Sequence, residues 1–359
     1  MRHPSRPAPA FALLLTLGLA SAAAATDPAA YYDPMFKSIA DSPTGLADAL
    51  AGIESSATDH FPAGPACPPI PATGYPNATT PRFYFLSQIL PAGIGVADPA
   101  CGYHLGCFLD QVPADLNHAA ATLVIDRACR VERTLVVPDR YEIAGVGLDG
   151  SGSLIFNLPD GARAIRFATA VGAAIRHSKI RDLSIGNLVC CGQTGIEISN
   201  SSLVQLANLR ISGFTRGIFG RVSYLNTITG SNLSNNGFGV VFGFDTTTWR
   251  IRDSASSQNF LGGVAFDATT RQSVISGSVF EANPWAGVDV SGFGNTIEGS
   301  WFEGNAVPIN HRGLIIRPGT RATAVLTSTF SIDKISDGGT DSRRCFNTSP
   351  DLYDPNSCP

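Results

Sequence analysis

Acidic side chains recur at an even spacing in the second half of the chain. Asp245, Asp267 and Asp289 are each 22 residues apart, and Arg221 and His311 stand on either side of them. A carboxylic acid beside a second carboxylate or a basic group can transfer protons at a bond that is being cleaved. Three carboxylates can also hold a hard cation such as Ca²⁺. These side chains converge only if the chain repeats in space with the same period.

Other residues near this series could bind a ligand. Glu197 and Arg312 carry charge, and Phe238, Phe260 and Trp285 each follow an Asn by one or two positions. Aromatic faces stack on ring-shaped ligands, but aromatic side chains also cover the core at the turns of a repeat protein. The pattern leaves both interpretations of the three aromatic residues open.

Two further pairs could supply acid or base groups. Glu281 and Glu303 each stand in a Phe-Glu-x-Asn sequence, 22 residues apart. If they stack in adjacent coils they lie about 5 Å apart, near the separation of the two carboxylates in retaining glycosidases. His177 and Lys179 could supply a base for β-elimination. The alternative is that all four are ordinary surface residues.

The elements that must position these residues form a repeat of 22 to 24 residues. One column has a Gly before a β-branched residue at Gly195, Gly217, Gly239, Gly263 and Gly287, with Pro308-Ile309 next. A second column contains Ile180, Val204, Ile228, Ile251, Ile275 and Ile297, and two polar columns contain Asn236, Asn259, Asn283, Asn305 and Ser231, Ser254, Ser278, Ser300. A repeat of this length with short apolar strands and no helical period predicts a solenoid, with coils about 4.8 Å apart. The Asn column is predicted to be structural, with amides hydrogen-bonded along the stack.

The repeats resemble the right-handed parallel β-helix of the pectin-lyase-like superfamily. The resemblance is carried by Thr227–Val240, Arg250–Val264, Val274–Val288 and Thr296–Ile309. The segment Thr134–Phe156 resembles the first coil of the pectate-lyase-3-like branch. The resemblance implies an all-β fold: a single-stranded right-handed parallel β-helix with coils of about 22–24 residues and an irregular, disulfide-tied N-terminal arm.

The same resemblance implies a polysaccharide groove along one sheet and its flanking loops. The outward row of that sheet is expected to hold Arg166, Glu197, Phe219, Val241, Ala265, Asp289 and Asn310, and the next row Arg221, Asp267 and Arg312. The expected function is cleavage of an extracellular or cell-wall polysaccharide, by a lyase or a glycoside hydrolase. Asp267 and Asp289 would be the acid–base pair, and an Asp cluster could bind Ca²⁺. The Asp-Asp and Gly-His-Gly sequences of polygalacturonases are missing, which keeps a second class open: a non-catalytic glycan-binding or surface-adhesion module.

The chain divides into four predicted parts. Residues 1–25 are typical of a signal peptide, because Arg2 and Arg6 precede the apolar run Phe11–Ala20 and a small-residue stretch. Residues 26–119 are predicted to be an irregular, Pro-rich arm, with one short helix near Thr44–Ser55. Residues 120–335 form the β-helix, and residues 336–359 form a disulfide-stapled tail.

Export gives the eight cysteines a simple interpretation as disulfides. Cys67, Cys101, Cys107 and Cys129 could tie the arm to the start of the core, and a second group, Cys345 and Cys358, could staple the tail. The alternative is a zinc site of Cys101, His104 and Cys107, although the matching second pair of ligands is missing. Partners for the adjacent Cys190 and Cys191 stay open.

Charge and hydropathy exclude two classes of partner. The formal net charge is −4 with no block of Lys or Arg, so the sequence lacks the clustered cations that nucleic-acid binding requires. The apolar run Phe11–Ala20 is about half the length needed to span a bilayer, and no later segment is long enough. We therefore expect an exported protein with a polysaccharide partner.

Overall fold

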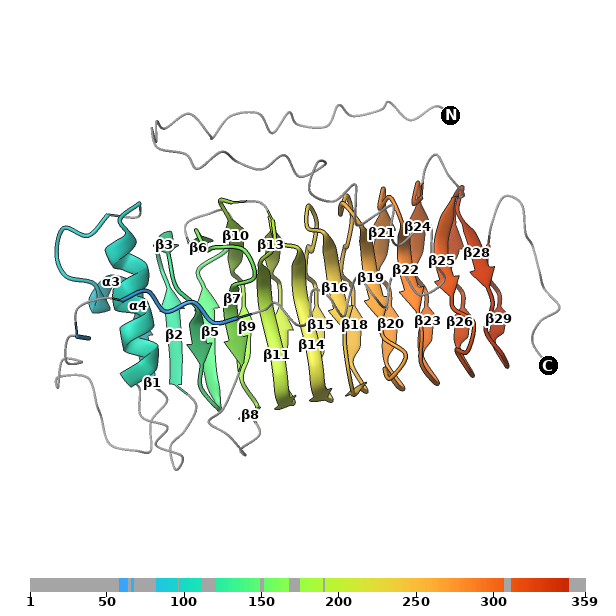
Figure 1. Ribbon diagram of the computed structural model, residues 1–359, viewed down its shortest axis with the longest axis horizontal. Coiled ribbons are helices and arrows are strands. Elements are labelled where there is room, and N and C mark those ends of the chain that lie inside the picture. The colour runs from blue at the N-terminus through green and yellow to red at the C-terminus, as the bar shows by residue number, and fades with distance from the viewer. Residues whose placement is uncertain are drawn as a thin grey trace, which may run out of the picture.

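The computed structural model describes residues 58–63, 66–67, 82–95, 97–111, 121–148, 152–167, 175–189, 191–306 and 311–348. Within these residues the chain winds into a solenoid, in which strands of successive coils pair in parallel. Figure 1 shows the coils stacked in chain order along the long axis of the molecule. The predicted parallel β-helix is confirmed.

The described strands form three faces. The first sheet contains β1 (Arg82–Phe85), β2 (Ala121–Ile125), β5 (Tyr141–Gly145), β9 (Lys179–Arg181), β12 (Gln205–Ala207), β15 (Thr227–Thr229), β18 (Arg250–Arg252), β20 (Val274–Ser276), β23 (Thr296–Glu298), β26 (Ala324–Leu326) and β29 (Arg343–Cys345). The second sheet contains β4 (Leu135–Val137), β7 (Arg163–Phe167), β11 (Thr194–Ser202), β14 (Arg216–Tyr224), β16 (Phe238–Phe242), β19 (Gly262–Phe266), β22 (Ala286–Val290), β25 (Arg312–Ile316) and β28 (Lys334–Asp337), with β8 (Ile175–Arg176) beside β11 and β17 (Thr246–Thr247) beside β14. The third face contains β3 (Cys129–Val131), β6 (Ser153–Phe156), β10 (Ser184–Asn187) and β13 (Arg210–Ser212), then β21 (Val279–Glu281), β24 (Trp301–Glu303) and β27 (Thr329–Phe330), joined by isolated bridges from Arg210 to Val279.

The glycine column of the sequence marks a position where successive coils approach closely. A Cβ at Gly217 would lie 2.7 Å from the carbonyl oxygen of Gly239, and a Cβ at Gly263 would lie 2.3 Å from that of Gly287. The apolar residues that follow these glycines are buried and lie in register in the second sheet. The column therefore arises because only glycine fits between the stacked turns.

Two predicted register positions are wrong. Ile180 pairs with Leu206 and not with Val204, so Val204 is buried two residues ahead of its expected column. Val288 pairs with Leu314, so Gly313-Leu314 continues the first column in place of Pro308-Ile309. The repeat of 22 to 24 residues fails here because this coil is longer. Ile309 lies outside the described residues.

The two polar columns form hydrogen-bonded ladders inside the turns. The backbone N–H of Asn236 donates to Oδ1 of Asn259 at 3.0 Å, and the same contact recurs between Asn259 and Asn283 and between Asn283 and Asn305, at 3.1 Å each. The backbone N–H of Asn305 donates to the buried carboxylate of Asp333, which takes the next place in the ladder. The Ser column forms the same kind of ladder from its own hydroxyls. The structural interpretation of the Asn column is confirmed, and the structure shows that the Ser column has the same role.

The N-terminal part of the described chain caps the solenoid. The helix α4 (Pro99–Gln111) packs on β3 and β4, and Gly102 allows the close approach, since a Cβ there would lie 2.5 Å from Val131 Cα. Figure 1 shows α4 at the end of the stack, ahead of β2. The short helix α3 (Leu86–Ile89) follows β1, which pairs with β2.

This region corrects the prediction of an irregular arm over residues 26–119, because residues 82–111 contain a strand and two helices. The Pro-rich stretch of the sequence ends at Pro81, before these elements. Helix α4 itself begins at Pro99, a position where the missing N–H costs nothing. The helix expected near Thr44–Ser55 lies outside the described residues.

Disulfides fix this cap as predicted. Cys67 is bonded to Cys107, and Cys101 is bonded to Cys129. The alternative zinc site is therefore wrong, because both of its cysteines are in disulfides. Cys191 and Cys345 are disulfide-bonded as well, while Cys190 and Cys358 lie outside the described residues.

The solenoid extends beyond its predicted C-terminal boundary at residue 335. Strand β28 pairs with β25, and β29 pairs with β26, so the coil continues to Cys345 in what the sequence analysis assigned to the tail. No helix in the described part of the chain is long and apolar enough to cross a membrane.

Candidate functional site

Asp289 lies in β22 with its carboxylate fully engaged. Its Oδ2 accepts hydrogen bonds from Trp285 Nε1 and Arg317 Nη2, both at 2.7 Å, and its Oδ1 accepts one from Arg317 Nε at 2.9 Å. The Asp289 side chain is 1% exposed. A buried carboxylate held by a guanidinium in this way balances that cation, and removing either partner leaves an uncompensated charge. The contacts thus give Asp289 a structural ion pair.

Arg317 is the residue that the sequence analysis missed. Val290 pairs with Ile316, so Arg317 follows in the row where Arg312 was expected. Arg312 instead opens β25 and pairs with Lys334 of the next coil. The glycine of Gly313-Leu314 was the available signal for the correct register.

Glu197 is also buried in an ion pair. Its side chain is 2% exposed and contacts Arg163, and Arg163 in turn contacts Asp59 at 3.3 Å. Glu197 pairs in register with Arg166 and with Phe219, as the predicted outward row requires. At the far end of that row Asp289 pairs with Ile315, and the expected Asn310 lies outside the described residues.

The predicted aromatic track does not form an exposed surface. Phe238 is 1% exposed, Trp285 is 8% exposed and Phe260 is half-buried. They belong to a second apolar cluster on the outside of the second sheet, with Cys191, Phe219, Val241, Leu261, Ala265, Ala286 and Ile315. The alternative interpretation, in which these rings cover apolar surface, fits their burial.

Asp245 and Asp267 hold the turns of neighbouring coils. Asp245 accepts a hydrogen bond from the Tyr224 hydroxyl at 2.7 Å, and this bond raises the pKa of Tyr224. Asp267 Oδ1 accepts the backbone N–H and the hydroxyl of Thr269 at 2.7 and 2.6 Å. The Asp245 N–H donates to Thr269 Oγ1 at 2.8 Å, which links these turns. Arg221, in register with Ser199, forms no ion pair within the described chain.

Among the described residues, no group of three or more His, Cys, Asp and Glu side chains could hold a metal ion. The expected calcium site therefore gains no support from them. His311 lies beside Asp333. Burial raises the pKa of the Asp333 carboxyl, and the electrostatic effect of His311 offsets part of that increase. His311 is thus part of the turn before β25 and not of a cluster with Asp289.

The stacked glutamates are placed as predicted but face solvent. Glu281 pairs in register with Glu303 of the next coil. Glu303 accepts a hydrogen bond from Trp301 Nε1 at 3.0 Å, and Glu281 is exposed. Apart from stacking the two glutamates on each other, the register brings no further acid or base group beside them.

A row rich in exposed aromatic and basic residues was not found from the sequence. It lies where the second sheet turns into the first, and its members pair from coil to coil. We call it the ridge, and it consists of Tyr224, Thr247, Arg271, Phe293 and Arg321. Phe293 is 49% exposed and Tyr224 36%.

The two arginines of the ridge are available for binding. Arg271 and Arg321 are exposed and take part in no ion pair within the described chain. Each is one coil, about 4.8 Å, from Phe293. On the adjoining first sheet, Arg250 and Arg252 of β18 are exposed and likewise form no ion pair among the described residues. This surface could not be found from the repeat, because the repeated columns are buried and the ridge positions carry different residue types from coil to coil.

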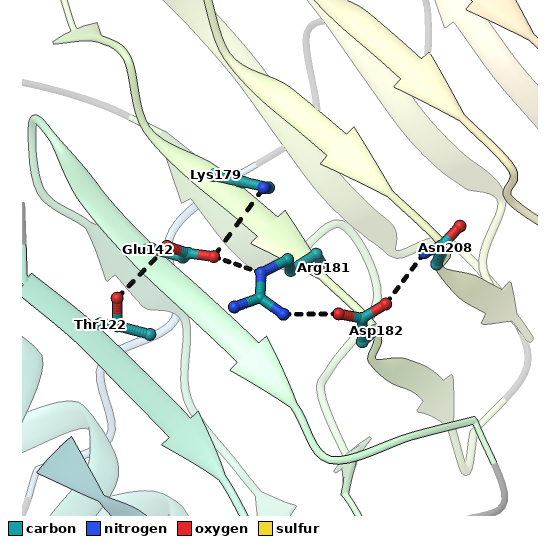
Figure 2. Close-up of polar contacts among 6 residues, drawn as sticks. All are labelled: Thr122, Glu142, Lys179, Arg181, Asp182 and Asn208. Atoms are coloured by element: carbon teal, nitrogen blue, oxygen red, sulfur yellow. Dashed lines mark hydrogen bonds and ion pairs between the residues drawn. The ribbon is translucent and has the colours of Figure 1, made fainter. Parts of the chain in front are cut away.

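A compact charged cluster lies on the outside of the first sheet. Figure 2 shows Arg181 between Glu142 and Asp182, with Lys179 and Asn208 at the margins. Arg181 Nε donates to Glu142, and Arg181 Nη1 donates to Asp182 at 2.7 Å. Lys179 Nζ lies 4.0 Å from Glu142, whereas the neighbouring His177 is exposed.

The contacts of this cluster shift two pKa values. The hydrogen bond to Asp182, followed by that to Glu142, raises the pKa of Arg181. Burial works to raise the pKa of Asp182, but the hydrogen bonds from Asn208 and Arg181 outweigh it and leave that pKa lowered. Arg181 thus stays charged and fixed, and Lys179 is the one cation in Figure 2 held only at a distance.

Comparisons with known proteins identify the fold. Residues 163–330 match the family model of the right handed beta helix region. Among solved structures, ORF18 of Geobacillus virus E2 aligns with a TM-score of 0.58 at 10% identity, over 75% of this chain and 62% of that chain. The Dettilon tailspike protein aligns at 0.53 and 12% identity, over 74% and 62%. Alginate lyase from Paenibacillus sp. str. FPU-7 aligns at 0.53 and 13% identity, over 69% and 93%. No curated protein matches the chain in sequence.

The chain therefore contains a right-handed β-helix region and is structurally similar to pectin-lyase-like β-helix proteins. It covers 62% of ORF18 and 62% of the Dettilon tailspike protein, which is less than two thirds of each. Structural neighbours include carbohydrate enzymes as well as tailspikes. At these identities the likeness defines the fold, and a site must be argued from this chain's own residues.

Proposed function

We propose that this protein binds an acidic polysaccharide outside the cell, with the ridge as its binding surface. One observation carries the proposal: exposed aromatic rings and unpaired arginines lie in one register row along the solenoid. The cysteines bonded in disulfides support an extracellular location. Carbohydrate enzymes among the structural neighbours agree with this class of ligand.

The chemistry of the ridge suits a chain of acidic sugars. The apolar face of a sugar ring packs on an aromatic face, as Phe293 offers. A guanidinium binds a carboxylate through two parallel hydrogen bonds, and Arg271 and Arg321 lie two coils apart, about 10 Å. A linear polysaccharide lying along the solenoid axis meets a cation, a ring and a second cation in turn.

Binding assays on single variants test this proposal. We expect the mature chain to bind polygalacturonate and not dextran in isothermal titration calorimetry. Arg271→Ala and Phe293→Ala should each weaken binding about tenfold, which corresponds to about 1.4 kcal/mol. Arg210→Ala and Trp301→Ala, at exposed positions of the third face, are the matched controls and should bind as the wild type does. Equal losses in all four variants would refute the ridge as the site.

Cleavage of the same polysaccharide is the second candidate function, favoured by the charged cluster of Figure 2. In β-elimination a base removes the proton next to a carboxylate, and a cation stabilises the negative charge that develops. The bond from the adjacent carbon to the leaving sugar oxygen then breaks, a carbon–carbon double bond forms, and the leaving oxygen takes up a proton from water. Lys179 would be the base, and Arg181, fixed by Glu142 and Asp182, would be the cation. Ultraviolet absorbance of unsaturated uronates that is lost in Lys179→Met supports this role. Silence in the wild type with binding intact leaves the protein a binding module.

A further inference from the structure

Two exposed arginines stand side by side on the outside of the first sheet. Arg250 and Arg252 are the outward residues of β18, and the buried Ile251 lies between them in the chain. Figure 1 shows β18 between β15 and β20, in the middle part of the stack. Alternate residues of a strand point to the same side and are about 7 Å apart. The two guanidinium groups therefore lie on one face, within reach of a single ligand.

The chain has a second pair of cations at the same two positions of an earlier coil, and carboxylates lie beside that pair. Lys179 and Arg181 of β9 occupy the places that Arg250 and Arg252 occupy three coils later. Figure 2 shows the carboxylate of Glu142, from the coil before β9, joined to both Lys179 and Arg181. The earlier pair thus has its counter-charge within the protein.

The arginine pair of β18 has no such counter-charge beside it. In the coil before β18, Thr227 takes the place of Glu142, and in the coil after β18 the pair is followed by Val274 and a serine. Asp253 lies in the turn after β18, and Glu298 lies two coils away. Within the described chain neither carboxylate forms an ion pair with either arginine. The two positive charges are therefore open to an external anion.

The spacing of the two guanidinium groups favours a tetrahedral anion. A guanidinium donates two parallel hydrogen bonds, and a carboxylate accepts both with its two oxygens. A sulfate or phosphate ester has three terminal oxygens that point in different directions, so it can accept hydrogen bonds from two guanidinium groups at once. Thr227 and Thr229, in register with the two arginines, bring hydroxyl donors to the same place.

The pair also lies near the ridge. Arg271 pairs in register with Thr247, and Arg250 follows Thr247 by three residues, which is at most about 11 Å along the chain. A polysaccharide bound along the ridge can therefore place an ester group of one of its sugars over the first sheet.

We propose that Arg250 and Arg252 bind a tetrahedral ester anion, sulfate or phosphate, carried by the polysaccharide. The inference rests on the proposed function for its choice of a polysaccharide, whereas the site itself is defined by β18 and not by the ridge. The ligand is then a uronate polymer with an added ester group, and the arginine pair selects it over the same polymer without the ester.

Calorimetry with polymers that differ only in the ester tests the selectivity. We expect chondroitin 4-sulfate to bind about tenfold more tightly than unsulfated chondroitin at low ionic strength. The double variant Arg250→Ala/Arg252→Ala should lose this gain and bind unsulfated chondroitin as the wild type does. Arg210→Ala, which removes an exposed cation of the third face, is the matched control and should keep the gain. Equal affinity of the wild type for both polymers, or a gain that persists in the double variant, would overturn the proposal.

Phosphorylated chondroitin in the same assay distinguishes the two esters. A gain with sulfate alone, with phosphate alone or with both identifies which ester the pair accepts. Arg271→Ala should weaken the binding of all these polymers alike, because it acts through the ridge. Failure of the ridge and failure of the arginine pair are thereby separated.

A single substitution beside the pair tests the missing counter-charge while both arginines stay in place. Thr227→Glu supplies the carboxylate that Glu142 provides three coils earlier, and Thr227→Gln has the same size without the charge. We expect the sulfate gain to disappear in Thr227→Glu and to remain in Thr227→Gln. An equal gain in the two variants would contradict the arginine pair as the anion site.

Nuclear magnetic resonance with inorganic sulfate tests the site without any polymer. The Nε signals of Arg250 and Arg252 should shift with sulfate and not with acetate at the same ionic strength, and the signal of Arg210 should shift with neither. These shifts in a protein that binds no polymer would refute the proposed function and leave the anion site standing. An absence of sulfate-dependent shifts at the pair would overturn the site.

Discussion

Replacing Asn283 by alanine tests the asparagine ladder that holds the turns together. Asn283 Oδ1 accepts the backbone N–H and the Nδ2 of Asn259, both at 3.1 Å. Its own Nδ2 donates to the Ser256 carbonyl at 2.9 Å and to Asn305 Oδ1 at 2.8 Å. The side chain is fully buried, so Asn283→Ala removes four hydrogen bonds from the interior of the solenoid.

The magnitude follows from the groups left without a partner. The Asn259 N–H and the Ser256 carbonyl lose these contacts, whereas Asn259 Nδ2 keeps Ser256 Oγ and Asn305 Oδ1 keeps the Asn283 N–H. A buried polar group without a partner costs about 1–3 kcal/mol. We therefore expect Asn283→Ala to lower the free energy of unfolding by about 4 kcal/mol.

Urea unfolding followed by circular dichroism measures this loss. Asn232→Ala is the matched control, because Asn232 is exposed and its side chain forms no hydrogen bond within the described chain; a change within about 0.5 kcal/mol is expected. A loss below about 1 kcal/mol for Asn283→Ala would refute the structural role of the ladder.

Three further outcomes follow from buried charges and the charged cluster. Burial raises the pKa of the Asp333 carboxyl above its ordinary value. The protonated carboxyl therefore stabilises the fold fully at pH values below the ordinary pKa, and this stabilisation is lost as the pH rises through the raised pKa of the folded state. Asp333→Asn should continue the ladder and raise the melting temperature at pH 7; an unchanged or lower value would contradict this. Asp289→Ala should lower the free energy of unfolding by about 3 kcal/mol in urea titrations, since it removes the buried carboxylate that Arg317 contacts, and a loss under about 1 kcal/mol would argue against the ion pair. Glu142→Gln should weaken the hold on Arg181, and nuclear magnetic resonance should then show a more mobile guanidinium; unchanged mobility would count against the cluster.

The repeat was predictable wherever a coil keeps its length. The columns through Gly239, Gly263 and Asn283 mark positions of close coil contact and buried hydrogen bonding, which admit few residue types. The register failed at Val204 and at Pro308 because loops of different length enter those coils. Helix α4 was missed because it contains two glycines, Gly102 and Gly106, which disfavour a helix, and because it follows a Pro-rich stretch.

The candidate site was less predictable for a different reason. The alternation of inward and outward residues along each strand correctly placed Glu197 and Asp289 on the outward row. A side chain that points outward is not necessarily exposed, and both carboxylates are buried in ion pairs. Burial there depends on chain segments distant in sequence, such as Asp59 against Arg163. The ridge lies at turn positions such as Phe293, where no repeated residue type draws attention.

Calorimetry with acidic oligosaccharides of increasing length tests the central claim most directly. Binding along the ridge predicts that affinity rises with length until the ligand spans the row from Tyr224 to Arg321 and then levels off. The double variant Arg271→Ala/Arg321→Ala should remove this gain. Unchanged affinity in the double variant, or equal binding of neutral oligosaccharides, would contradict the proposed function.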